Sequence, residues 1–462
     1  MPRPALVRYA GLAGSLSLAV AAWFGGATNP WEPTIRPASI FAGDDGVLVP
    51  LAWLVGIVLL VGAWVAGVRV AGGQTSRWAY VTAALWSLPL LAFLPLGSYD
   101  AYSYACQGWQ QGAGLDPYAG GVDLLGCPWA DAVAPTWRDA PAPYGPLFLL
   151  LAALAAKTGS LAGTLAGLRV IALLGVVLIA VALPVLARRG NVPLSRAVWL
   201  VLACPLVPIH LISGAHNDAL MVGLFVAGLA CAIKQRGWAA GLLLGLAIAV
   251  KATAVVVAPF ALLLLLTRRR QAELVGGAVL ALAATTLVSG RGFGWVTALA
   301  GSGISVQWTS PPTAVGMTID LFGPDAVPVT RIIGIVALAI VLALLFFRAR
   351  SRDPLLYAGY ALAATVLLAP VFHPWYAVWP LAVLAATLHH HLRWLVVPCA
   401  VASALCLPDG YNLALAVKSQ GAVAMTALLV YLLWKTLYEA KNRTGRRRGP
   451  DHTPDRLSRR DA

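Results

Sequence analysis

The stretch LGSYDAYSYACQGWQQGAGLDPYAGGVDLLGCPWADAVAPTWRDAPAPYGP, residues 96–146, interrupts a chain that otherwise consists mostly of long apolar runs. It is rich in acidic, aromatic, Gly and Pro residues, and its first carboxylate, Asp100, follows the end of an apolar run at Leu96. A carboxylate at the end of a membrane helix is costly to place and is a functional hypothesis by default. Spacing alone leaves two interpretations: a reaction chamber with Asp100 as its base, or a solvated loop whose acids only keep it in water.

The composition predicts an all-α polytopic integral membrane protein. Of the 462 residues, 60% are hydrophobic and 11% are charged, and the mean hydropathy is +0.79. A soluble domain has about 25% charged residues. Apolar runs of roughly 20 residues, each able to cross a hydrocarbon core, recur along the chain, so we expect a bundle of about 12–14 transmembrane helices with a long first extracytoplasmic loop. The predicted spans are 5–24, 47–68, 78–96, 163–187, 194–213, 218–234, 238–250, 253–267, 272–289, 330–348, 354–371, 375–390, 394–408 and 420–438.

The placement of charge predicts how these spans are oriented. The net charge is +15, and basic residues crowd into short connectors such as 188–196, 268–270 and 348–352, with more in the tail 441–462, which is the pattern of cytoplasmic loops. Both termini are then cytoplasmic, and most acids fall on the outside. Residues 1–440 form a single transmembrane domain in this interpretation, and the basic tail 441–462 is expected to be disordered against anionic lipid. No aromatic interleaving of the basic residues supports binding to nucleic acid.

Two segments do not fit a simple count of spans. Residues 147–156 are apolar but short, and we interpret them as a helix at the outer interface. The runs 238–250 and 253–267 are interrupted by Lys251 and Pro259 and predict a broken or re-entrant hairpin, which a membrane tolerates only inside protein or beside a cavity. Lys251 is interpreted as a helix-break residue that reaches cytoplasmic water.

Four polar clusters stand at the predicted outer ends of the helices, and each also has a purely structural interpretation. Trp and Tyr side chains at that depth are common interfacial anchors, Asn and Asp are common helix caps, and His373 before Pro374 suits a turn. No H-E-x-x-H or Cys/His spacing supports a metal site. The clusters are 99–118 with 142–146, 213–218, 308–312 and 372–376.

The chain lacks the signatures of a nucleotide-dependent enzyme and of a transporter. It has no phosphate-binding loop and no dinucleotide fingerprint, and no inverted repeat of the transporter type is visible. Of six cysteines, only Cys106 and Cys127 lie in the central loop. A disulfide between them would suit an oxidising exterior, although sequence cannot show that their geometry permits it.

Several strings in this chain resemble those of one enzyme family. GSYDAYSYACQG (97–108), LDPY (115–118), APYGPL (142–147), GAHNDALMVGL (214–224) and FHPWY (372–376) occur in that order. Together they resemble the actinobacterial polyprenyl-phosphomannose-dependent α-1,6-mannosyltransferases of the lipomannan pathway, members of the GT-C superfamily. The GAHNDALM string is the most specific of them. The resemblance implies a GT-C-type fold, a polyprenyl-phosphate mannose donor, a lipid-anchored mannan acceptor, an active site on the outer face of the cell membrane and a catalytic acid that matches Asp100.

The residue types fit this chemistry on their own. An inverting transfer needs one base within reach of the acceptor hydroxyl, and a phosphate leaving group needs cations or N–H donors. We therefore predict Asp100 as the base, no metal or other cofactor, and His373 and Arg331 as partners of the donor phosphate, with lipid snorkelling as the alternative for Arg331. The remaining predicted substrate-binding residues are Tyr102, Asp116, Tyr144, His216, Asn217, Asp218, Trp375 and Tyr376.

Other functions remain open at this point. The chain could instead be another kind of lipid-carrier glycosyltransferase, one that forms an α-1,2 bond or transfers a different sugar. A transporter or flippase of a lipid-linked sugar is the alternative from another class, but it should carry ionisable residues near mid-membrane. The predicted spans are nearly free of such residues, and this favours the enzyme.

Overall fold

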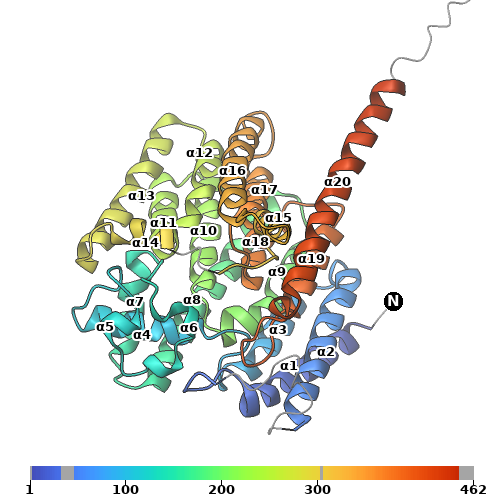
Figure 1. The fold of residues 1–462 in the computed structure, drawn as a ribbon. Coiled ribbons are helices and arrows are strands. Elements are labelled where there is room, and N and C mark those ends of the chain that lie inside the picture. The colour runs from blue at the N-terminus through green and yellow to red at the C-terminus, as the bar shows by residue number, and fades with distance from the viewer. Residues whose placement is uncertain (1–2, 33–45, 302–304, 447–462) are drawn as a thin grey trace, which may run out of the picture.

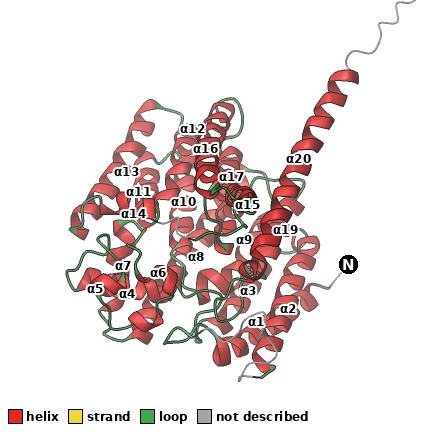
Figure 2. Ribbon diagram, viewed as in Figure 1, coloured by secondary structure: helices red, strands yellow, loops and turns green. Residues whose placement is uncertain are grey.

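The computed structural model describes residues 3–32, 46–301 and 305–446, and in these residues it is all-helical (Figures 1 and 2). The described residues contain no β-strand; one isolated bridge joins Cys406 to Asn412. The prediction of an all-α polytopic membrane protein is confirmed.

Six described helices are long and apolar enough to cross a membrane. Each has more than 20 residues, which at about 1.5 Å per residue exceeds the thickness of a hydrocarbon core. They are α1 (Pro4–Gly25), α2 (Leu48–Ala71), α8 (Leu161–Arg189), α13 (Arg268–Ser289), α16 (Val327–Ala349) and α20 (Lys418–Arg446).

The other predicted transmembrane helices are shorter or broken in the described residues, so only six, or seven if one bent pair counts as a span, are long enough by themselves to cross a membrane. Run 194–213 becomes α9 (Leu194–Leu202) and a π-helical segment, η3 (Val207–Ser213), bent by 59°. Pro205 and Pro208 explain the bend, because proline removes a backbone donor. The remaining short apolar helices are α3 (Ser76–Ser87), η1 (Leu88–Leu90), α10 (Asp218–Ile233), α11 (Gly237–Val250), η4 (Ala252–Val257), α12 (Ala258–Leu264), α17 (Pro354–Leu368), η5 (Pro374–Ala377), α18 (Val378–Leu384) and α19 (Arg393–Ser403).

The two irregular segments fold as helices of the expected lengths. Residues 146–156 form α7 (Pro146–Ala156), which is too short to span. The hairpin breaks at Lys251, between α11 and η4. Short helices occupy the central loop and the connectors after α13 and α19: α4 (Asp100–Gly112), α5 (Val122–Leu125), η2 (Ala130–Ala132), α6 (Pro135–Arg138), α14 (Gly294–Gly301), α15 (Pro311–Asp320) and η6 (Leu413–Val417).

Close helix packing brings the polar clusters together. Helix α4 lies against α7, and α10 lies between α8 and α11. Small residues permit the approach: a Cβ on Gly175 of α8 would lie 2.2 Å from the Ala219 backbone, and one on Gly223 of α10 would lie 2.4 Å from the Gly175 carbonyl oxygen. The first residues of α4 and α10 therefore sit in one part of the molecule.

Helix α20 extends beyond the other helices as a rod (Figure 1). It continues through Arg446, so residues 441–446 of the tail that was expected to be disordered are helical. Residues 447–462 of that tail lie outside the described residues.

Candidate active site

Asp100 is the first residue of α4 and faces a hollow. Gly97, at φ +73°, turns the chain before the helix, a conformation that costs glycine little. The Asp100 N–H then donates to Ser98 Oγ at 3.0 Å. The Asp100 side chain is 14% exposed and lies in the wall of a cavity of about 490 Å³. A carboxylate at a helix N-terminus is also stabilised by the helix dipole.

Two side chains approach the Asp100 carboxylate from inside the protein. Tyr104, one turn later on the same face of α4, has its hydroxyl 3.5 Å from Asp100 Oδ2. His216 Nδ1 lies 3.7 Å from the same oxygen and 3.3 Å from the Tyr104 hydroxyl. Asp100, Tyr104 and His216 thus form one polar cluster. The Tyr104 hydroxyl and the His216 ring are the polar groups nearest to a proton bound by the carboxylate.

The surroundings tune Asp100 toward base chemistry. Burial raises the pKa of the Asp100 carboxyl from its ordinary 3.8 to about 6, and the positive charge of Lys251 partly opposes this shift. Such a group is ionised at neutral pH and is a stronger base than an ordinary aspartate. A base is most effective when its pKa lies near the working pH.

Asp218 is held very differently, although it too begins a helix. Its side chain is fully buried. Lys251 Nζ lies 3.0 Å from each carboxylate oxygen, and Trp379 Nε1 donates to Oδ1 at 2.7 Å. The interpretation of Lys251 as a residue in cytoplasmic water is therefore wrong, because its ammonium group is paired inside the protein.

Aromatic rings surround the Lys251 ammonium group. Nζ lies 4.5 Å from the ring centroid of Tyr376, 5.3 Å from that of Trp379 and 6.0 Å from that of Tyr144. Rings at these distances stabilise a cation further. The Lys251 side chain keeps 12% exposure.

Stacked rings connect the polar cluster 213–218 with the polar cluster 372–376. His216 stacks on Trp375 with ring centroids 3.7 Å apart, and Trp375 stacks on His373 at 4.8 Å. His373 and Trp375 both line the Asp100 cavity. Burial lowers the pKa of His373 to about 3, so His373 is neutral at pH 7 and offers a hydrogen bond rather than a charge.

The rest of the cavity wall combines aromatic faces with amides. Trp31, Trp137 and Tyr411 supply the rings, and Gln307 and Asn412 supply the amides. Asn412 Nδ2 donates to Gln307 Oε1 at 3.4 Å, which joins two connectors that are distant in sequence. Flat apolar faces beside a few polar groups are typical of a small-molecule site, and a sugar ring presents both kinds of surface.

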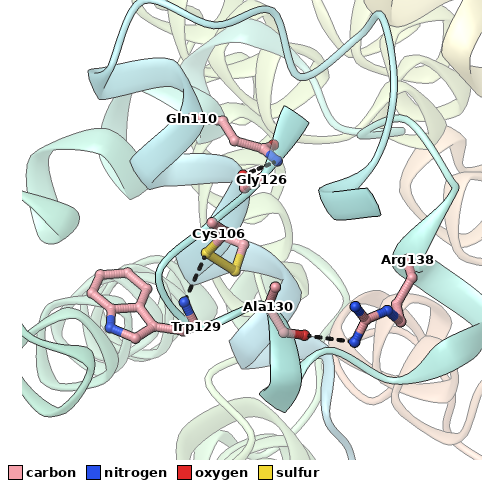
Figure 3. The surroundings of a disulfide bond; sticks show 7 residues. Cys106, Gln110, Gly126, Trp129, Ala130 and Arg138 are labelled. Atoms are coloured by element: carbon pink, nitrogen blue, oxygen red, sulfur yellow. Dashed lines mark hydrogen bonds between the residues drawn. A yellow bond between two sulfur atoms is a disulfide. The ribbon is translucent and has the colours of Figure 1, made fainter. Parts of the chain in front are cut away.

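A disulfide fixes the central loop to the helix that carries Asp100 (Figure 3). Cys106 of α4 is bonded to Cys127, and their Cα atoms are 5.5 Å apart. Gln110 of the same helix donates to the Gly126 carbonyl at 3.1 Å, and Arg138 pairs with Asp123 at 2.8 Å. The pairing that the sequence left open is thus made, and it orders the loop around the cavity.

Comparison with known proteins identifies the family. The model of the α-(1→6)-mannopyranosyltransferase N-terminal domain matches residues 8–267, and that of the MptB C-terminal domain matches residues 312–435. The chain belongs to the α-(1→6)-mannopyranosyltransferase family. The family resemblance read from the sequence strings is confirmed.

The similar proteins align with most of the length of this chain. It is 36% identical to α-(1→6)-mannopyranosyltransferase A of Mycobacterium tuberculosis over 81% of this chain and 79% of that protein. It is 33% identical to a probable α-(1→6)-mannopyranosyltransferase of Mycolicibacterium smegmatis (74% and 69%), and 29% identical to α-(1→6)-mannopyranosyltransferase B of Corynebacterium glutamicum (83% and 73%). No solved structure matches the chain.

Not every residue predicted for the mannosyltransferase site reaches the cavity. The Tyr102 hydroxyl donates to the Ala27 carbonyl in the core, and Asp116 accepts the Tyr118 N–H at 3.0 Å in a turn. Arg331 donates to Thr313 Oγ1 at 3.0 Å and to the Ser305 carbonyl at 2.7 Å. These side chains shape the loops around the site rather than line it.

Asn217 does not act as the helix cap that its position suggested. It precedes α10, but its side chain makes no capping hydrogen bond. Its amide is buried, and neither the amide oxygen nor the amide nitrogen has a hydrogen-bond partner among the described residues. The roles assigned to Asn217 toward substrate stay predictions.

Arg169 is a residue of the mannosyltransferase that sequence reasoning missed. It lies within α8 and donates to the carbonyls of Leu91, Phe93 and Ser213. These carbonyls belong to the segments that lead into Asp100 and His216, so Arg169 ties both segments together. Its position inside an apolar run was the available signal, since an ionisable residue there marks a functional region.

The described residues contain no group of three His, Cys, Asp or Glu side chains that could hold a metal ion. The expectation that the transfer needs no metal or other cofactor stays a prediction.

Proposed function

We propose that this mannosyltransferase moves mannose from polyprenyl-phosphate mannose to a hydroxyl of a lipid-anchored mannan, at the outer face of the cell membrane, with inversion at the anomeric carbon. The observation that carries the proposal is the placement of Asp100: its carboxylate faces the aromatic cavity, while the buried acid beside it is neutralised by Lys251. The relatives in Mycobacterium tuberculosis and Corynebacterium glutamicum are α-(1→6)-mannopyranosyltransferases, which supports an α-(1→6) linkage.

The proposed reaction forms one bond, breaks one bond and transfers one proton. The acceptor oxygen bonds to the anomeric carbon of mannose, and the bond from that carbon to the phosphate oxygen breaks. The acceptor proton passes to Asp100, with Tyr104 and His216 beside the carboxylate. The electron pair leaves with the polyprenyl phosphate, whose charge needs cations or N–H donors.

The phosphate partner best supported by the geometry is Lys251, with His373 as a neutral hydrogen-bond donor. Lys251 is the cation whose charge acts on Asp100, and it keeps some exposure despite its pairing with Asp218. Arg331, proposed from sequence, is already bonded to Thr313 and Ser305. It supports the 305–313 segment that borders the cavity.

Two observations support a lipid-linked donor rather than a nucleotide sugar. The chain has no nucleotide-binding motif, as the sequence shows. The Cys106–Cys127 disulfide lies in the same loop as Asp100, and disulfides persist in oxidising compartments outside the cytosol. A donor anchored in the bilayer reaches that side, whereas a cytosolic nucleotide sugar does not.

The test is a transfer assay with the full-length protein in proteoliposomes. One arm receives polyprenyl-phosphate [14C]mannose, the other receives a nucleotide [14C]mannose, and both receive an α-1,6-oligomannoside acceptor. We expect labelled product from the lipid donor only, with a new α-1,6 bond by linkage analysis. Product from the nucleotide donor, or lipid donor moved across the bilayer without transfer, would refute the proposal.

A further inference from the structure

An apolar groove opens on the surface of the molecule between α17, α18 and α19. Its volume is about 520 Å³, and its walls include Ala363, Leu367, Leu381, Leu388 and Trp394. Leu367 and Trp394 are exposed at its edges, so the groove is open to the surroundings of the helices. In a membrane those surroundings are hydrocarbon chains.

This groove and the Asp100 cavity share a wall. Phe372 and Ala377 line the groove, whereas His373 and Trp375, between them in sequence, line the cavity. The segment from α19 onward also borders both hollows. Cys399 of α19 lines the groove, and Cys406, just beyond that helix, lines the cavity. A molecule with a polar head and an apolar tail could therefore occupy both hollows at once.

The far end of the groove is polar. His390 and His391, in the connector between α18 and α19, and Arg393, the first residue of α19, line it there. Basic residues in a connector mark the cytoplasmic end of membrane helices, so the apolar walls run from the Asp100 side toward the opposite face. That direction suits a long chain lying along the helices, parallel to the neighbouring lipids.

We propose that the groove between α17, α18 and α19 holds the isoprenoid chain of the lipid-linked sugar donor, with its phosphate at residues 372–377 and its sugar beside Asp100. This inference rests on the proposed function, because it takes the donor to be a polyprenyl phosphate. The chain and the sugar are joined through the phosphate, so a sugar at Asp100 requires the chain to leave the cavity nearby. The groove is the apolar hollow that adjoins the cavity through the 372–377 wall.

Filling the groove tests the inference by donor length. Ala363→Trp places a large ring on the groove wall of α17. We expect the KM for a long-chain donor of about ten isoprene units to rise at least tenfold with kcat retained, and the KM for a two-isoprene donor to stay near wild type. Ala339→Trp is the matched control, because Ala339 is exposed on α16 outside the groove; it should change neither KM. Equal changes for both donors, or none for either, would overturn the inference.

Photolabelling of the wild-type protein gives a readout that depends on neither variant. A polyprenyl phosphate that carries a photoactivatable group on its second isoprene unit should label peptides within 354–403. Unlabelled polyprenyl phosphate should suppress this labelling, whereas added phospholipid should not. Labelling spread over other lipid-facing helices, or suppressed equally by phospholipid, would overturn the inference. Absence of mannose transfer from either donor would instead refute the proposed function, and photolabelling would still decide the groove.

Discussion

The N-terminal ends of α4 and α10 carry the same residue in the same helical position, yet they hold it in opposite ways. Asp100 faces a cavity, with a tyrosine hydroxyl and a histidine ring at 3.5 and 3.7 Å and no Lys or Arg within ion-pair distance among the described residues. Asp218 is fully buried between Lys251 and Trp379. A carboxylate that is already neutralised is a poor base, so Asp100 is suited to take a proton and Asp218 to hold a cation in place.

The largest effect should come from removing the Asp100 charge. Asp100→Asn keeps the shape of the side chain but cannot accept the acceptor proton, so we expect transfer to fall by about 10²–10⁴-fold. The melting temperature should stay near wild type, since the side chain has no ion pair to lose. Initial rates and thermal unfolding measure the two quantities. Asp123→Asn, which breaks an exposed pair with Arg138 in the same loop, is the control and should keep near-normal turnover.

At the N-terminal end of α10, removal of the Lys251 charge should lower the stability of the protein rather than its catalytic rate alone. Lys251→Met leaves Asp218 buried without its counter-ion, which should cost about 3–5 kcal/mol of unfolding free energy. The double change Lys251→Met with Asp218→Leu removes both charges and should recover most of that loss. Arg189→Met, which breaks the exposed Arg189–Asp353 pair, should cost about 0–1 kcal/mol. A single Lys251 variant as stable as the Arg189 variant would show that the pair is not structural.

A smaller loss of stability should follow at the α4 end when its disulfide is removed. The cysteines are separated by 21 residues, and closing a loop of that size stabilises by about 3 kcal/mol in the chain-entropy model. Cys106→Ser with Cys127→Ser should therefore lower the melting temperature, and a reducing agent should lower that of the wild type but not that of the double variant. If the reductant shifts both proteins equally, it acts somewhere other than this bond.

The sequence was informative where apolar runs and charge decide the structure. Counting spans placed the clusters at Asp100, His216 and Trp375 at helix ends on one side, and the structure brings these three together. The same count places Trp31, Gln307 and Asn412 in outer connectors, so their meeting in one cavity could have been anticipated. Their residue types gave no local motif, and they were missed.

What the sequence did not reveal depends on the approach of distant segments. The sequence led us to place Lys251 in cytoplasmic water, whereas its ammonium group pairs with Asp218, a contact that depends on the close packing of α10 and α11. Tyr102 and Asp116 were predicted to bind substrate because both lie in suggestive motifs, but in the structure both side chains bond to backbone groups of their own surroundings. The helices differ from the predicted spans at Pro89, Pro205 and Pro208, where apolar runs that look continuous are broken or bent.

The pH dependence of transfer tests the role of Asp100 most directly, because it reports the group that exchanges the proton. Burial raises the pKa of this carboxyl from 3.8 to about 6, and only the ionised form can act as the base. We predict that kcat/KM for the lipid donor is level above pH 6 and falls about tenfold per pH unit below it. A profile that stays level down to pH 4.5 would contradict the assignment of Asp100 as the base.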